Sequence, residues 1–132
     1  MSPEQIARSM IDRAQLTDPS TAQLLEQALM YAQNPEKYDS TIVFKQLLGW
    51  AAHEALAAGL YCFLRYPYDM KHAITLAVIT PGDSDSIATI AGALVGAYNG
   101  QDCLPGDWLE YIENKDEIEN LIEQFSTHCV VH

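Results

Sequence analysis

The residues with the clearest chemical potential form a short acidic segment, Pro-Gly-Asp-Ser-Asp-Ser, at positions 81–86. Carboxylates at positions i and i+2 of a turn, followed by a hydroxyl at the start of a helix, can direct hard oxygen atoms to one point. Oxygen ligands of this kind suit Mg²⁺, Mn²⁺ or Ca²⁺ rather than zinc. Asp83, Asp85 and Ser86 are therefore the candidate metal ligands.

The same residues also allow a purely structural interpretation. Ser84 or Asp85 can cap the helix that follows, with Asp83 forming an Asx-turn. The positive potential at a helix N-terminus disfavours a bound cation unless the carboxylates outweigh it. From the residues alone, both a metal site and a helix cap stay open.

The elements that must position this segment are helices, because helical periodicity runs through nearly the whole chain. We predict an all-α, multi-helix orthogonal bundle. Ser2, Pro3 and Gln5 form a capping box for a first helix at the start of the chain. The other helices are expected over residues 19–33, 40–48, 50–65, 70–80, 86–99, 108–112 and 116–125.

The two helices on either side of the acidic segment are strongly apolar. Residues 50–65 are apolar on nearly every face, which predicts a central helix covered on several sides. Residues 86–99 form a second all-apolar helix, in which Gly92 and Gly96 lie one turn apart and allow a neighbouring helix to approach closely. A loop between two such helices is expected to bury its carboxylates, which is unfavourable unless a partner compensates them.

Composition excludes several classes of function. The formal net charge of −11 argues against binding of nucleic acid, which needs clustered Lys and Arg, and against an anionic membrane surface. No segment reaches the ~18 apolar residues of a membrane-spanning helix, and the polar N-terminus shows no secretory signal. Cys62, Cys103 and Cys129 lie far apart without a Cys-x-x-Cys pair, which favours reduced thiols and a cytoplasmic location.

Residues 82–100 resemble the signature of the ADP-ribosylglycohydrolase family. That signature is a Gly-Asp-Ser/Thr-Asp-Ser/Thr loop followed by a helix carrying Ala-Gly and Gly-Ala-Tyr. Upstream, residues 49–64 are similar to the long helix that precedes the loop in the family. Downstream, Leu104-Pro105 and Trp108-Leu109 are similar to the turn that closes it.

The matches occur in the family's order, which divides the chain into three parts within one partial domain, residues 1–132. Residues 49–109 form a family-like core with the metal loop at 82–86. Residues 1–48 are interpreted as peripheral helices without a family motif, and residues 110–132 as an acidic terminal helix and tail. The chain is thereby identified as the C-terminal portion of an ADP-ribosylglycohydrolase-like fold.

The resemblance implies an all-α domain with two Mg²⁺ ions in a central cleft, where Mn²⁺ could replace them. The ions orient the ribose hydroxyls of an ADP-ribosyl group while water cleaves its N- or O-glycosidic bond. Carried over to this sequence, Asp83 and Asp85 would be carboxylate ligands and Ser86 a hydroxyl ligand.

One departure from the family pattern limits what the chain can do. The remaining ligands of the family come from a Gly-Asp-Ala-x-Gly segment and a Thr-Asp-Asp-Ser/Thr segment, and neither occurs before Gly49. The general acid or base is expected in the same N-terminal half, so no catalytic or substrate-binding residue is assigned. We hypothesise a fragment or split subunit of a Mg²⁺-dependent ADP-ribosyl hydrolase that is inactive alone. The alternative is a non-catalytic relative that acts as an interaction or structural module.

The expected partners follow from this hypothesis. They are an ADP-ribosyl-containing substrate and either a complementary N-terminal half or a second copy of the chain. A half-domain has too few helices to cover two all-apolar helices, so we expect the pairing to occur through an apolar face.

Several other side chains with chemical potential are interpreted as structural. His53, on the predicted central helix, is expected to be a buried or rim histidine rather than a ligand. The tail group of His128, Cys129 and His132 could bind a transition metal but is better explained as a frayed terminus. Three aromatic residues are expected in the core, with adenine stacking by one of them left open: Trp50, Tyr98 and Trp108.

Overall fold

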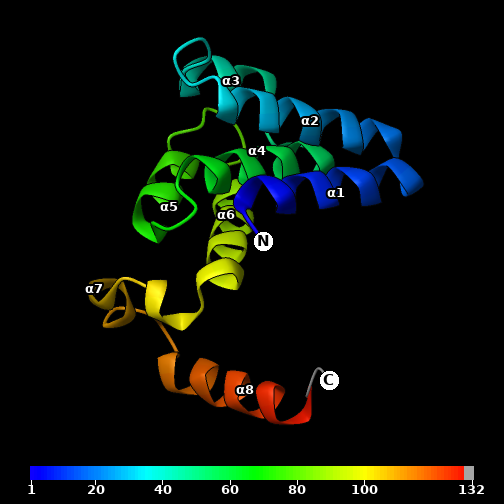
Figure 1. Cartoon of the computed structure of the whole chain (residues 1–132). Helices are drawn as coiled ribbons and strands as arrows, with labels where there is room; N and C mark the ends of the chain where they lie inside the picture. The colour runs from blue at the N-terminus through cyan, green and yellow to red at the C-terminus, as the bar shows by residue number, and fades with distance from the viewer. Residues whose placement is uncertain (130–132) are drawn as a thin grey trace.

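A computed structural model describes residues 1–129, and over that range the secondary structure is entirely helical. The all-α prediction is therefore confirmed. Figure 1 shows the helices α1 to α6 gathered in one bundle, from which the chain continues to α7 and α8. In chain order the elements are α1 (Pro3–Thr17), α2 (Pro19–Gln33), α3 (Ser40–Gln46), α4 (Ala52–Arg65), α5 (Met70–Val78), α6 (Ser84–Asn99), the 3-10 turn η1 (Gln101–Cys103), α7 (Gly106–Leu109) and α8 (Lys115–His128).

Short polar side chains begin most of these helices. At α1 the predicted capping box is present: the Ser2 amide donates to Gln5 Oε1 at 2.7 Å and the Gln5 amide donates to Ser2 Oγ at 3.2 Å. The carboxylates of Asp18, Asp39 and Asp69 accept hydrogen bonds from first-turn amides of α2, α3 and α5. Each cap satisfies an amide that has no partner within the helix. These starts follow from local sequence alone.

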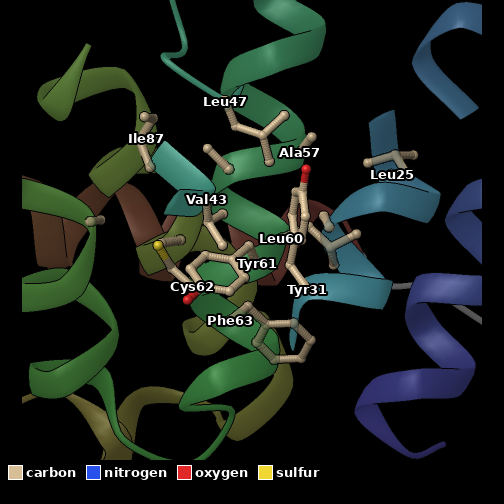
Figure 2. Packing of buried hydrophobic residues seen from close by; sticks show 14 of the residues in the cluster. Leu25, Tyr31, Val43, Leu47, Ala57, Leu60, Tyr61, Cys62, Phe63 and Ile87 are labelled. Atoms are coloured by element: carbon tan, nitrogen blue, oxygen red, sulfur yellow. The ribbon is translucent and has the colours of Figure 1, made fainter. Parts of the chain in front are cut away.

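Helix α4 is the centre of the bundle, as its all-round apolar character predicted. Helices α1, α2, α5 and α6 all contact it. Figure 2 shows Leu60, Tyr61 and Phe63 of α4 lying among side chains from α2 and α3. The Tyr61 ring packs edge-on against Phe44, with ring centroids 5.8 Å apart. This core fixes α4, and α4 in turn positions α6.

Helices α4 and α6 approach each other closely at Gly59. A Cβ atom added to Gly59 would lie 2.8 Å from the Cβ of Ile90 and 3.3 Å from the backbone nitrogen of Ala91. The close approach predicted at Gly92 exists, because an added Cβ would lie 3.0 Å from Ile74 Cδ1 of α5. At Gly96 the nearest atom would be Met70 Cε at 3.7 Å, which is ordinary contact. The close crossing of α4 and α6 therefore involves a glycine that the sequence motif did not single out.

Helix α6 is buried along one face only, in line with the expectation that this chain has too few helices to cover its apolar helices on every side. Its buried residues are Ile87, Ala91 and Val95, the stripe that faces α4 and α5. Helix α5 ends at Val78, two residues before the predicted boundary, and the Val78 side chain is half exposed. Composition marked these helices as apolar, but it could not show how many neighbours cover them.

Helix α8 is amphipathic as predicted, but its apolar face packs on nothing in residues 1–129. Figure 1 shows it standing apart from the bundle. The expected helix over 108–112 is also replaced by the shorter α7, Gly106–Leu109. The apolar residues of α8 are between 43% and 69% exposed: Ile118, Leu121, Ile122 and Phe125.

No helix in the described part of the chain is both long and apolar enough to cross a membrane.

Replacing Gly59 with alanine should destabilise the protein, because the new methyl group would overlap the stiff β-branched Ile90. We expect a loss of about 1–3 kcal/mol in the free energy of unfolding, measured by urea titration. Gly96→Ala is the matched control on α6: its methyl group has room, and alanine should add roughly 0.5–1 kcal/mol of helix stability. Equal stabilities of the two variants would contradict the close helix crossing at Gly59.

Candidate functional site

The acidic segment lies at the surface between α5 and α6 and is attached to the chain between α3 and α4. The amide of Asp83 donates a hydrogen bond to the carbonyl oxygen of Leu48 at 2.8 Å. The amide of Gly82 donates to the hydroxyl of Thr80 at 3.2 Å. A Cβ atom on Gly82 would overlap the Leu48 carbonyl. Gly82 is thus needed for the close approach of two backbones.

The role of Gly82 is one of space and not of backbone conformation. Among residues 1–129, the glycines with positive φ are Gly49 (82°) and Gly100 (80°), so Gly82 needs space rather than a special conformation. Gly49 needs both. An added Cβ there would lie 2.8 Å from Ile87 Cδ1 and 3.6 Å from Asp83 Cβ. Gly49 therefore packs directly against the first turn of α6, a role that the sequence did not reveal.

The candidate ligands surround the first turn of α6. Asp83 is the N-cap residue, and its Oδ1 accepts a hydrogen bond from the Ser86 amide at 3.4 Å. Asp85 Oδ1 accepts from the same amide at 3.1 Å. The structural interpretation had named Ser84 or Asp85 as the cap; the cap is Asp83, because α6 begins two residues earlier than expected. Helix capping and the candidate metal site therefore share one residue.

The carboxylates are less buried than predicted. Asp83 is half-buried and Asp85 is exposed. Hydrogen bonding with the Asp85 carboxyl group, and then with Ser86, lowers the pKa of Asp83 below its ordinary value of 3.8. Two carboxyl groups can share a hydrogen bond only while one of them carries a proton. When both are ionised they repel each other, and a bound cation would offset that repulsion.

The donor types at this loop fit a hard divalent ion. Two carboxylates and the Ser86 hydroxyl present only oxygen atoms, which is the ligand chemistry of Mg²⁺. Within residues 1–129, no group of three or more His, Cys, Asp and Glu side chains is gathered so that it could hold a metal. A Mg²⁺ ion at this loop would therefore take its remaining ligands from water, substrate or another chain segment.

None of the other residues considered from sequence has a recorded side-chain contact with the acidic loop among residues 1–129. His53 is half-buried on α4, consistent with a rim histidine. His128 and Cys129 are exposed, and His132 lies outside the described residues. Trp108 is half-buried in α7. Trp50 was expected in the core, but it precedes α4 and is 69% exposed, one residue away from Gly49.

The chain belongs to the ADP-ribosylglycohydrolase family, whose sequence model matches residues 2–131. Human ADP-ribosylhydrolase ARH3 is 33% identical over 85 residues, which cover 57% of this chain and 23% of that protein. The mouse protein of the same name has the same identity and coverage, and the zebrafish one is 29% identical over 93 residues, 62% of this chain and 25% of that protein. The chain thus spans about a quarter of the length of these relatives. No solved structure matches it.

The lowered pKa of Asp83 predicts an acid-dependent stability. The carboxylate stabilises the folded state fully above its ordinary pKa of 3.8, and this contribution is lost as the pH falls through the folded-state pKa. Asp83→Asn keeps a capping acceptor but cannot titrate in this range. The difference in unfolding free energy between the wild type and Asp83→Asn should stay constant above about pH 5 and shrink below it. A difference that is unchanged down to about pH 3 would show that the ionised Asp83 carboxylate is not stabilised by its hydrogen bonds with Asp85 and Ser86.

Proposed function

We propose that this chain is part of a Mg²⁺-dependent ADP-ribosyl hydrolase that cleaves the N- or O-glycosidic bond of an ADP-ribosylated substrate. In this proposal Asp83, Asp85 and Ser86 supply one side of a metal centre built for two Mg²⁺ ions, with Mn²⁺ as a possible substitute. The supporting observation is the convergence of two carboxylates at the start of α6, in a chain of the ADP-ribosylglycohydrolase family.

The residues of the loop can perform the steps that this activity requires of them. Divalent cations in such a site supply Lewis acidity and a template for substrate hydroxyls. Asp83 and Asp85 place two negative charges at a helix start, which outweighs the roughly +0.5 charge of the α6 dipole. The Leu48 carbonyl accepts a hydrogen bond from the Asp83 amide, which fixes the backbone that carries this carboxylate. Departure of the acceptor group from the ribose also needs a proton donor, which we assign to a complementary N-terminal half.

The chain is proposed to be inactive alone and to act with a partner in the cytoplasm. Two carboxylates and one hydroxyl fall short of the six ligands that octahedral Mg²⁺ takes. Matches to the relatives cover about a quarter of their length. The exposed apolar face of α8 supports pairing, either with a complementary half or with a second copy.

A non-catalytic role is the second candidate, and one observation favours it. Asp83 already serves α6 as its N-cap, so the residue has a structural reason to be an aspartate. In that case the family fold would act as an interaction or structural module without a metal. The two proposals differ in whether the loop binds a divalent ion.

Binding of Mn²⁺ should locate the metal site on the isolated chain. We expect amide signals of residues 82–87 to broaden first as Mn²⁺ is added in an NMR titration, with a roughly millimolar dissociation constant for so few ligands. Asp83→Asn should abolish this selective broadening while keeping the helix cap. Asp102→Asn is the control, because it removes an exposed carboxylate of η1 outside the loop. Equal broadening of the amide signals of residues 82–87 in both variants would show that Mn²⁺ is only attracted nonspecifically to an acidic protein.

Activity should depend on completing the domain. The pure chain should release no ADP-ribose from a modified substrate in the presence of Mg²⁺. Mixing it with an N-terminal half that carries the Gly-Asp-Ala-x-Gly and Thr-Asp-Asp segments should restore release. In the mixture, Asp83→Asn should lower the rate of ADP-ribose release by more than about 100-fold. The loss should be this large because mutating a residue that only supports a metal ligand already costs about 10- to 100-fold. Measurable hydrolysis by the chain alone would overturn the proposed inactivity.

A further inference from the structure

Helix α8 carries a narrow apolar stripe between acidic edges. The stripe begins at Ile118, includes Phe125 and ends at Cys129, and its large side chains are exposed. At 3.6 residues per turn, Glu117 and Glu119 fall on opposite sides of it. The helix contains four carboxylates and one lysine. A partner surface for α8 should therefore be apolar and free of negative charge.

The helical bundle of the same chain contains a groove with these properties. It runs along α1, where α1 packs against α2 and α4, and its volume is about 490 Å³. Arg13 is the single charged side chain that lines it, and no carboxylate does, although the chain has 18 acidic residues and only 7 lysines and arginines. Its apolar lining includes residues of all three helices: Ile6, Met10, Ala14, Leu25 and Leu56.

The groove and the α8 stripe match in length and in charge. The α1 side of the groove runs from Ile6 to Thr17, and the stripe runs from Ile118 to Cys129. Both spans are about 17 Å long at 1.5 Å per residue. Among residues 1–129, Arg13 makes no ion pair, so its guanidinium group is free to meet a carboxylate at the edge of α8.

The buried area favours an exchange of α8 between two copies over a direct pairing of two α8 helices. The large apolar side chains of α8 expose on the order of 500 Å². Two such faces would bury about 1,000 Å², less than the roughly 1,200 Å² at which stable interfaces begin. They would also bring together two acidic helices, which repel each other. Exchange into two grooves buries about twice the area and closes with twofold symmetry.

We propose that two copies of this chain form a twofold dimer in which α8 of each copy lies in the α1 groove of the other. Arg13 then faces a carboxylate at the edge of the partner's α8. Figure 1 shows α8 standing apart from its own bundle, as an exchanged helix must. This chain contains both complementary surfaces, so no other protein is needed to supply the groove. The dimer does not depend on the metal centre at Asp83.

Sedimentation equilibrium of the whole chain tests the dimer. The wild type should be dimeric at micromolar concentration, and Phe125→Asp should raise the dimer Kd by at least about 30-fold, the effect of losing a strong interface contact. Phe125 is 69% exposed, so the substitution should leave the bundle folded. Leu16→Asp is the control: Leu16 is 82% exposed on α1 outside the groove, and its replacement should leave the Kd unchanged.

A matched pair of charge reversals on α1 tests the groove itself. Arg13→Glu should raise the dimer Kd by more than about 10-fold, because it places like charges opposite each other. Arg8→Glu changes the net charge equally but lies outside this groove, so it should leave the Kd unchanged.

Three results would overturn the proposal. A wild type that is monomeric at about 100 μM would mean that α8 folds onto its own bundle or needs a different protein. A dimer that Phe125→Asp leaves intact would form through another surface. Loss of the dimer in Phe125→Asp, with equal Kd values for Arg13→Glu and Arg8→Glu, would indicate direct pairing of α8 helices. None of these results alters the expected binding of Mn²⁺ at Asp83.

Discussion

The hydrogen bond from the Asp83 amide to the Leu48 carbonyl oxygen joins two segments that lie far apart in the sequence. It forms because Gly82 has no side chain to keep the two backbones apart, and because Gly49 can adopt a positive φ beside the start of α6. The completely buried side chain of Ile87 fixes the first turn of α6 to the hydrophobic core. The direction of the Asp83 carboxylate therefore depends on the packing of α4 and α6, not on the loop alone.

Capping a helix and binding a cation are compatible roles for Asp83. A carboxylate has about four acceptor positions, and the Ser86 amide occupies only one of them, through a long contact of 3.4 Å. The cap orients the side chain and satisfies an amide at the helix start. The remaining lone pairs, together with those of Asp85, stay available on the solvent side. The two interpretations of the segment thus describe one arrangement.

The sequence predicted what local chemistry determines. The capping box at Ser2 and the helix starts at residues 19 and 70 were recognised because a helix start depends mainly on neighbouring residues. The role of Gly59 was not recognised, since it depends on where Ile90 of another helix lies. Likewise the apolar face of α8 was predicted from its periodicity, but periodicity cannot say what covers a face. Exposure of Trp50 escaped prediction for the same reason, since a hydrophobic residue beside an apolar helix is usually buried.

A crystal structure of the chain grown with Mn²⁺ would test the metal site most directly, because the anomalous signal of manganese identifies the ion. An anomalous peak should lie about 2 Å from carboxylate oxygens of Asp83 and Asp85 and from the Ser86 hydroxyl, with water completing the coordination. Well-ordered carboxylates that contact only backbone amides, with no anomalous peak near α6, would contradict the proposed metal centre.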